Sequence, residues 1–263
     1  MKTKQVFLLL ILFLGLFACN NHPKMVLNDL NKVNDSLQEE LLVKRMEVEE
    51  LNKLVPKLLV KRYDSASVML FQPYGLNVEI THKRPTRSLD NYLCVPASFS
   101  SPQNKIVGIF VENGSLISNI TDEITNGVCV ITNNDIEILP TNKYSENNTI
   151  DSIDNNYSLF QQILLINESK IVDCDVWGDT KYLRRALIIK EDKYSIAESY
   201  QPVSIKEFQE SLRDIGVTDA VYLDMGTWSE GWFQDCQGKF IKIGRNMKNT
   251  DKQTNWIVFT INE

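Results

Sequence analysis

The residues best suited to chemistry are two adjacent arginines and a later aspartate. Arg184 and Arg185 stand side by side, and Asp224 follows the apolar run 220–223, two positions before Gly226. A guanidinium binds an oxyanion such as phosphate through two parallel hydrogen bonds. Neighbouring side chains on a strand point to opposite faces, so we expect one arginine to face a site and the other to face solvent.

These three residues also have ordinary structural interpretations. Asp224 is placed to cap a backbone amide in a turn at the end of a strand. Either arginine can form a structural ion pair with one of the 34 acidic residues.

Aromatic residues surround a second carboxylate shortly after Asp224. Trp228, Trp232 and Phe233 lie within a few positions of Glu230. Such rings can stack on a sugar while Glu230 assists, although aromatic side chains more commonly fill a core or anchor a loop. Both interpretations stay open at this stage.

One helix is well marked by the sequence and leads towards Asp224. Residues 205–215 follow Ser204, and Glu207 completes a capping box with that serine, while Gly216 ends the segment. The run 220–223 then predicts a buried strand that delivers Asp224 to a loop.

The rest of the chain after residue 63 is rich in short apolar runs separated by Asn, Gly, Ser and Pro. These runs predict β-strands that pair mainly with antiparallel neighbours, with hairpin turns at 112–115 and 132–135 and a polar loop at 141–156. Clear examples are 76–80, 106–111, 128–131 and 136–139.

The N-terminus has the layout of a secretion signal. Lys2 and Lys4 precede a 12-residue apolar run at 6–17, which is shorter than the roughly 20 residues of a membrane-spanning helix. The segment Leu16-Phe17-Ala18-Cys19 then resembles the lipobox of bacterial lipoproteins, in which the cysteine is acylated. That resemblance implies a signal peptide at 1–18 and a lipid on Cys19 that holds the chain to a membrane of the bacterial cell envelope, outside the cytoplasm. An ordinary signal peptide is the alternative.

Residues 27–58 follow a heptad pattern typical of a coiled coil. Eight of the ten a and d positions are apolar, and Asn34 and Lys44 are the exceptions that restrict register and partner number. We therefore expect 19–62 to form a lipidated stem that can self-associate, with Pro56 near its end. An amphipathic helix packed on its own domain is the alternative.

Charge and cysteine content narrow the function classes further. The net charge of −6 does not suit nucleic-acid binding, and the basic stretch 81–87 resembles a solvated turn. No Cys or His spacing indicates a metal site, and the sequence leaves the cofactor open. Cys94 and Cys129 lie in apolar runs, where buried free thiols are expected rather than disulfides.

Three segments resemble the C-terminal half of the phosphodiester glycosidase domain family in order and spacing. A weaker resemblance includes 94–99, Gly108 and 252–256, so the likeness covers about residues 89–263. The three segments are Arg184-Arg185-Ala186-Leu187, PVSIKEFQESLRDIGV at 202–217 and DAVYLDMG at 219–226.

This resemblance implies an α+β domain at 63–263, with a mixed, largely antiparallel twisted sheet and packed helices, preceded by the coiled-coil helix. It also implies a hydrolase that acts on a sugar-1-phosphodiester or a related glycan linkage, and of the two arginines it favours Arg184. The expected catalytic residues are Asp224, Arg184 and Glu230, and the expected substrate-binding residues are Arg185, Gly226, Thr227, Trp228 and Asn255.

The chain departs from the family at two glycine-rich motifs. It has Pro-Ala-Ser-Phe-Ser at 96–100 where the family has Asn-Gly-Gly-Phe-Phe, and Asp224-Met225-Gly226 where the family has Asp-Gly-Gly. A side chain at a former glycine narrows the approach of a ligand to the backbone. A non-catalytic lipoprotein that binds a glycan or a protein is therefore the rival hypothesis, and a third makes the coiled coil the functional part.

Overall fold

The computed structural model describes residues 23–54, 56–120, 124–132, 135–144, 146–174, 176–226, 229–244 and 250–261. The chain divides into two compact units, residues 1–52 and 53–263. The predicted signal peptide and Cys19 lie outside the described residues.

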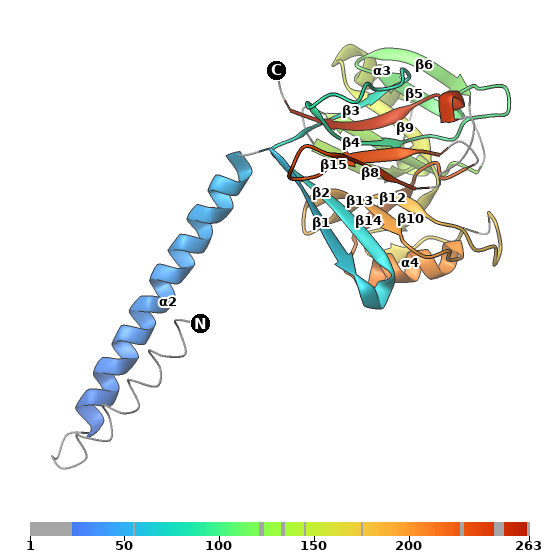
Figure 1. Ribbon diagram of the computed structural model, residues 1–263. Coiled ribbons are helices and arrows are strands. Elements are labelled where there is room, and N and C mark those ends of the chain that lie inside the picture. Colours follow the sequence, from blue (N-terminus) through green and yellow to red (C-terminus); the bar gives the residue numbers. More distant parts are fainter. Residues whose placement is uncertain are drawn as a thin grey trace. The chain divides into compact units, whose positions relative to one another are not determined.

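The first unit contains one long helix, α2 (Pro23–Leu54), drawn in blue in Figure 1. Leu37 and Leu41, at d and a positions of the heptads, are about half exposed or more, and Lys44 forms an exposed ion pair with Glu40 one turn away. The helix is confirmed, whereas its assembly into a coiled coil stays a prediction. Among the described residues, no helix combines the length and apolar character needed to cross a membrane.

The second unit begins with a strand rather than with the end of the stem. Residues 57–62, which the heptad pattern assigned to the stem, form most of β1 and pair along their length with β2. Leu58, a heptad d position, packs against the core of this unit instead. Pro56 lies between helix and strand, as expected of a residue that cannot continue a helix.

Three antiparallel sheets make up the second unit. The seven-stranded sheet has the order β1 (Lys57–Tyr63), β2 (Val68–Tyr74), β13 (Lys193–Ser199), β12 (Arg185–Lys190), β14 (Asp219–Tyr222), β10 (Leu164–Asn167) and β11 (Lys170–Ile171). The β4 sheet has the order β16 (Phe240–Ile243), β15 (Gly231–Gln234), β4 (Asn91–Pro96), β17 (Trp256–Thr260) and β3 (Asn77–Thr81). The β9 sheet has the order β6 (Ser115–Ile120), β5 (Gly108–Glu112), β9 (Ser158–Gln162), β7 (Gly127–Thr132) and β8 (Asp135–Pro140).

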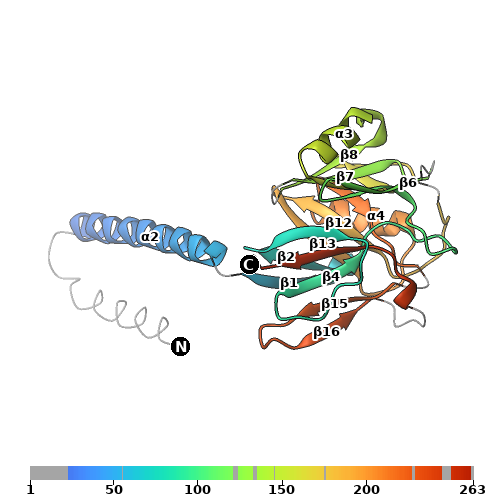
Figure 2. The ribbon, with the colours of Figure 1, turned by 90° about the horizontal axis from the view of Figure 1, so that it is seen from above.

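The three sheets share one hydrophobic core. Phe71 of the seven-stranded sheet, Phe259 of the β4 sheet and Phe160 of the β9 sheet are all fully buried in the same cluster. Figure 2 shows the sheets of this unit from above. Cys94 and Cys129 are buried with free thiols, as their apolar surroundings predicted.

The helix α4 (Ile205–Asp214) covers the other face of the seven-stranded sheet. Its capping box is formed, because Ser204 Oγ accepts from Glu207 N at 3.1 Å and Glu207 accepts from Ser204 N at 2.8 Å. Phe208 and Leu212 are fully buried against the sheet. Gly216 follows with a φ of +84°, which is the left-handed conformation that ends a helix.

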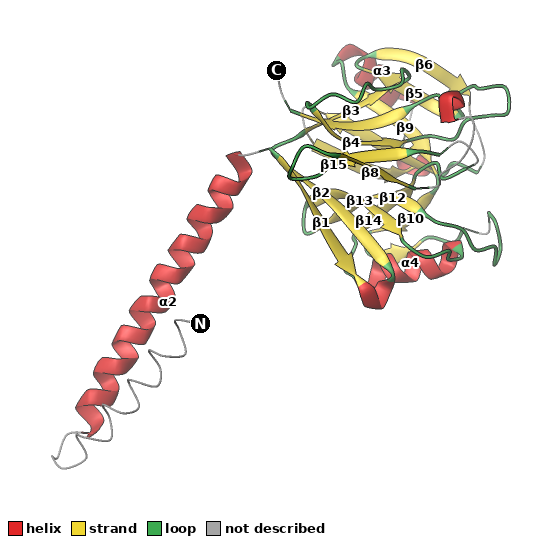
Figure 3. Ribbon diagram, in the orientation of Figure 1, coloured by secondary structure: helices red, strands yellow, loops and turns green. Residues whose placement is uncertain are grey.

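The expected α+β class with packed helices is wrong. All strand pairings among the described residues are antiparallel, and the second unit has only two described helices longer than one turn, α4 and α3 (Glu146–Asp154). The domain is therefore largely β, as the predominance of yellow strands in Figure 3 shows. The family resemblance implied packed helices, whereas antiparallel hairpins build most of the domain. The 3-10 turns are η1 (Asp64–Ala66), η2 (Thr141–Lys143) and η3 (Thr250–Lys252).

The predicted strands and hairpins agree with the structure more closely. The runs 76–80, 106–111, 128–131 and 136–139 correspond to β3, β5, β7 and β8. The turn at 112–115 joins β5 to β6, as predicted. The polar segment 141–156, predicted as a loop, contains α3, because its few apolar residues include Ile153, which packs on the β9 sheet.

Candidate functional site

Asp224 lies just beyond β14, where the chain leaves the seven-stranded sheet. Its backbone N–H donates to the carbonyl of Ala97 at 3.0 Å, which joins this turn to the end of β4. Its carboxylate accepts a hydrogen bond from Gly226 N at 2.8 Å. The residue is only 5% exposed, so a charged carboxylate is held in largely apolar surroundings.

Burial raises the pKa of Asp224 from 3.8 to about 6. Hydrogen bonds from the Gly226 backbone, the Gln253 side chain and the Ser100 backbone, together with the charge of Arg185, oppose the rise only in part. The carboxyl therefore exchanges its proton near neutral pH, which is the property expected of an acid or base in catalysis.

Arg185 forms a buried ion pair on the same side of the sheet as Asp224. Its Nε and Nη2 donate to Glu198 on the neighbouring strand at 2.9 and 2.7 Å, and both side chains are buried. Glu198 also accepts from Gly244 N at 2.9 Å. Gly244 has a φ of +77°, and a Cβ there would lie 2.5 Å from Arg185 Nη2. The pair therefore ties the β12–β13 hairpin to the loop that follows β16.

Arg184 points to the opposite face and is also buried, at 1% exposure. Its guanidinium stacks over Trp177, with Cζ 4.7 Å from the ring centroid, and donates to the carbonyls of Val203 and Thr180 at 3.2 and 2.8 Å. Tyr222 lies in the same cluster, where burial raises its pKa to about 12. The two arginines thus occupy opposite faces as predicted, but neither faces solvent.

Asn255 holds two chain segments together. Its Oδ1 accepts from Ser98 N at 2.6 Å, and its Nδ2 donates to Ser98 O at 3.0 Å. Asn255 and Ser98 are fully buried. The adjacent Gln253 donates to Asn255 O at 3.3 Å and also bonds Asp224, so Asn255 supports the Asp224 turn indirectly.

Glu230 is placed away from Asp224, on the outer face of the β4 sheet. It is 2% exposed and forms an ion pair with Arg84, with Arg87 Nη2 3.9 Å away. Burial acts to raise its pKa, but hydrogen bonds from Thr250 and Arg84 outweigh that effect and hold the pKa below its ordinary value. The lowered pKa therefore favours the charged form of Glu230 beside these arginines. Thr227 and Trp228, the other predicted site residues of this segment, lie outside the described residues.

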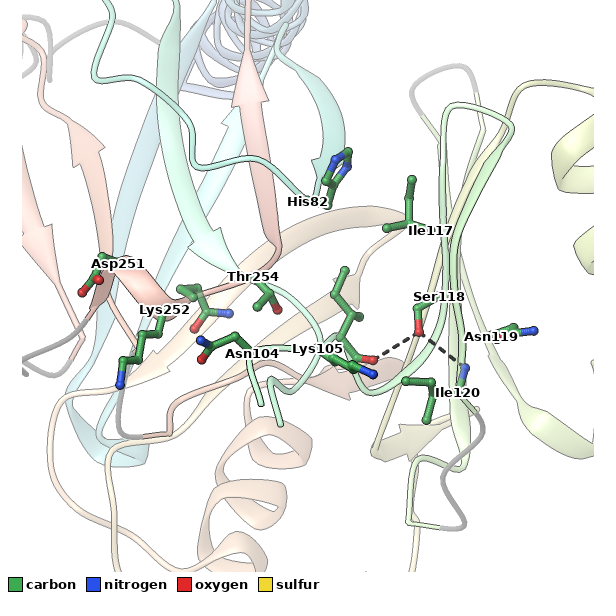
Figure 4. Close-up of a pocket in the computed structure, with 12 residues that line it drawn as sticks. His82, Asn104, Lys105, Ile117, Ser118, Asn119, Ile120, Asp251, Lys252 and Thr254 are labelled. Atoms are coloured by element: carbon green, nitrogen blue, oxygen red, sulfur yellow. Dashed lines mark hydrogen bonds between the residues drawn. The ribbon is translucent and has the colours of Figure 1, made fainter. Parts of the chain in front are cut away.

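A pocket of about 690 Å³ opens between β6 and the segment that contains η3 (Figure 4). Gln253 belongs to its wall and also bonds Asp224, so the pocket and the carboxyl share one residue. The Oε1 atom of Gln253 is buried and has no hydrogen-bond partner among the described residues. The lining residues are His82, Asn104, Lys105, Ile106, Ile117, Ser118, Asn119, Ile120, Asp251, Lys252, Gln253 and Thr254.

The structure thus brings Asp224, Gly226, Arg185 and Asn255 into one region and leaves Arg184 and Glu230 in others. Residues 96–100 also join this region, through Ala97, Ser98 and Ser100, although they lack the glycines of the family motif. Sequence reasoning missed Gln253, whose only signal was its place in the segment 252–256. Among the described residues, no group of three His, Cys, Asp or Glu side chains could hold a metal ion.

Comparison with known proteins supports the fold alone. No protein-family model matches the sequence, and no curated protein matches it. The structure is similar to the catalytic domain of zebrafish N-acetylglucosamine-1-phosphodiester alpha-N-acetylglucosaminidase auto-inhibited by its pro-peptide, with a TM-score of 0.54 and 13% identity over 80% of this chain and 83% of that chain. A hypothetical protein from Synechocystis gives a TM-score of 0.49 and 10% identity over 78% and 62% of the two chains. The fold is therefore like that of the zebrafish domain.

Proposed function

We propose that the domain hydrolyses a sugar-1-phosphodiester or a related glycan linkage, with Asp224 as the group that handles the proton. The observation that carries this proposal is the buried Asp224 carboxyl. Its pKa is about 6, and it is hydrogen-bonded to Gln253, a residue of the pocket wall. The likeness of the fold to a glycosidase that acts on a phosphodiester supports the same reaction class.

In the proposed reaction, water attacks the anomeric carbon while ionised Asp224 accepts a proton from that water. The bond between the anomeric carbon and the phosphate oxygen breaks, and its electron pair leaves with the phosphomonoester. Because phosphate is a good leaving group, one carboxyl suffices where ordinary glycosidases use two. Asp224 must be ionised to act as this base, which its pKa permits above about pH 6.

The pocket supplies groups for both halves of such a substrate. Lys105 belongs to its lining and can balance the phosphate charge, while Gln253 Oε1, which has no hydrogen-bond partner among the described residues, can accept from a sugar hydroxyl. Arg184 and Arg185 are not among the lining residues and already bond other protein groups. We therefore assign Arg185, whose charge acts on Asp224, to support of the site, and Arg184 to the cluster on the opposite face of the sheet.

We expect the full chain to release free sugar from at least one member of a panel of sugar-1-phosphodiesters. Asp224→Asn should lower that rate by about 100-fold or more, the usual contribution of a general acid or base. Asp173→Asn is the matched control, because it makes the same chemical change at an exposed residue. Released sugar is measured by chromatography across the panel.

Two results would count against the proposal. Wild-type chain that releases no sugar from any substrate would favour the non-catalytic hypothesis, in which the domain binds a glycan or a protein. Release that persists in Asp224→Asn would move the chemistry to other residues.

We further propose that the chain is a lipoprotein of the bacterial cell envelope, anchored through Cys19 and held off the membrane by α2 as a self-associating stem. The basic start, apolar run and lipobox-like segment support this placement. Cys19→Ser should abolish incorporation of labelled fatty acid in a bacterial host, since acylation requires the thiol. Label that persists in the variant would show that the anchor lies elsewhere.

A further inference from the structure

Two arginines stack on two tryptophans at the outer face of the β4 sheet. Arg84 Cζ lies 5.4 Å from the ring centroid of Trp256, and Arg87 Cζ lies 5.4 Å from that of Trp232. The two indole rings are themselves neighbours, with centroids 5.3 Å apart. Both rings are buried, so they form a firm base for the guanidinium groups.

The Glu230 carboxylate positions the arginines through charge interactions. It is 2% exposed and pairs with Arg84, which also donates to the carbonyl of Thr250 at 2.9 Å. The charge of Lys242 acts on Glu230 as well. The two arginines together carry one positive charge more than this one carboxylate balances, in a chain whose net charge is −6.

The cluster also has more hydrogen-bond donors than acceptors. Arg84 and Arg87 side chains are 43% and 50% exposed, so part of each guanidinium faces solvent. The indole N–H groups of Trp232 and Trp256 are buried and have no hydrogen-bond partner among the described residues. Because these indole groups are buried, the partly exposed guanidinium groups are the donors that a ligand can reach, and an oxygen-rich anion accepts from several such donors at once.

We propose that Arg84 and Arg87 form a binding site for a phosphate group, separate from Asp224 and independent of the hydrolase proposal. The net positive charge of Arg84, Arg87 and Glu230 taken together attracts a phosphate, and the phosphate oxygens suit the forked donors of arginine. Glu230 then acts as a positioning residue, because its ion pair fixes Arg84 before any ligand arrives. The basic stretch 81–87, which resembled a solvated turn in the sequence, supplies both arginines.

The test is calorimetric titration of the full chain with inorganic phosphate at low ionic strength, where screening is weak. Wild type should bind phosphate saturably, and Arg87→Gln should weaken binding by about tenfold or more, the usual effect of losing a charged hydrogen bond. Arg87 is chosen because its loss leaves the Arg84–Glu230 pair intact. Lys206→Gln, which removes an equal charge from an exposed position on α4, should bind as wild type does.

Equal weakening in Arg87→Gln and Lys206→Gln would overturn the proposal, since it would indicate only a diffuse effect of net charge. Absence of saturable phosphate binding in folded wild type, with folding checked by circular dichroism, would also overturn it. Asp224→Asn should keep full phosphate affinity, which separates this site from the hydrolase. Parallel titrations with glucose 6-phosphate and with vesicles containing phosphatidic acid then distinguish a soluble phosphate ester from a lipid headgroup.

Discussion

Replacing Arg185 with methionine is expected to lower the free energy of unfolding by about 3–5 kcal/mol, the scale for breaking a buried ion pair. The guanidinium is fully buried and donates twice to Glu198, so its removal leaves a carboxylate in the protein interior without a countercharge. Methionine keeps much of the volume and removes only the charge and the donors. Urea denaturation followed by circular dichroism measures the change.

Two controls separate the buried charge from a general effect of losing arginine. Arg213→Met breaks an exposed pair with Asp214 and should cost at most about 1 kcal/mol. The double variant Arg185→Met with Glu198→Leu should recover much of the lost stability, because no buried charge then stays unpaired. A cost below about 1 kcal/mol for Arg185→Met alone would show that Glu198 becomes solvated or forms new pairs with other groups.

Asp224→Asn is expected to raise the stability of the protein at neutral pH while it abolishes the proposed activity. The pKa of Asp224 is about 6 in the folded chain against 3.8 ordinarily, so folding favours the protonated form. Its contribution to stability is fully present below pH 3.8 and is lost as pH rises through about 6. A shift of about two pKa units corresponds to roughly 3 kcal/mol, and asparagine avoids this cost because it cannot ionise.

The signature of this effect is its dependence on pH. The difference in unfolding free energy between Asp224→Asn and wild type should be about 0.5 kcal/mol at pH 4 and should grow to roughly 3 kcal/mol at pH 7. Asp173→Asn, at an exposed residue, should show a small difference that changes little over the same range. A difference for Asp224→Asn that is constant with pH would indicate that the two side chains differ in packing rather than in charge. Gain of stability with loss of activity is the usual behaviour of a strained functional residue.

Local signals predicted the elements around Asp224 well. The capping box at Ser204 and the glycine at Gly216 mark α4 because both act within one helical turn, so no distant contact is required. The hairpin turn at Asn113 and Gly114 likewise joins β5 to β6 as expected, because both residues adopt a positive φ. The α+β class was implied by the family resemblance and is wrong, because the three short segments that carry the resemblance hold no information on how many strands surround them.

The long helix shows how tertiary pairing overrides a periodic pattern. Leu58 continues the heptad register of α2, yet Pro56 ends the helix and β2 provides backbone partners, so residues from Lys57 onward form a strand. Apolar side chains at heptad spacing fit either a helix or the inner face of a strand over so short a run. Pairing with β2 therefore decides that these residues form a strand and not a helix.

By itself, the sequence determined that Asp224 ends a buried strand, that the two arginines point to opposite faces, and that residues near 97, 224 and 253 belong to one set of motifs. Only the tertiary structure decided what each charge does. Burial raises the pKa of Asp224, Glu198 on the neighbouring strand neutralises Arg185, and Arg84, which is distant in the chain, pairs with Glu230. The pKa and the interaction energy of a charged group depend on its desolvation and on its nearest opposite charge. Both are set by the sheets that fold together, so they cannot be inferred from neighbours in sequence.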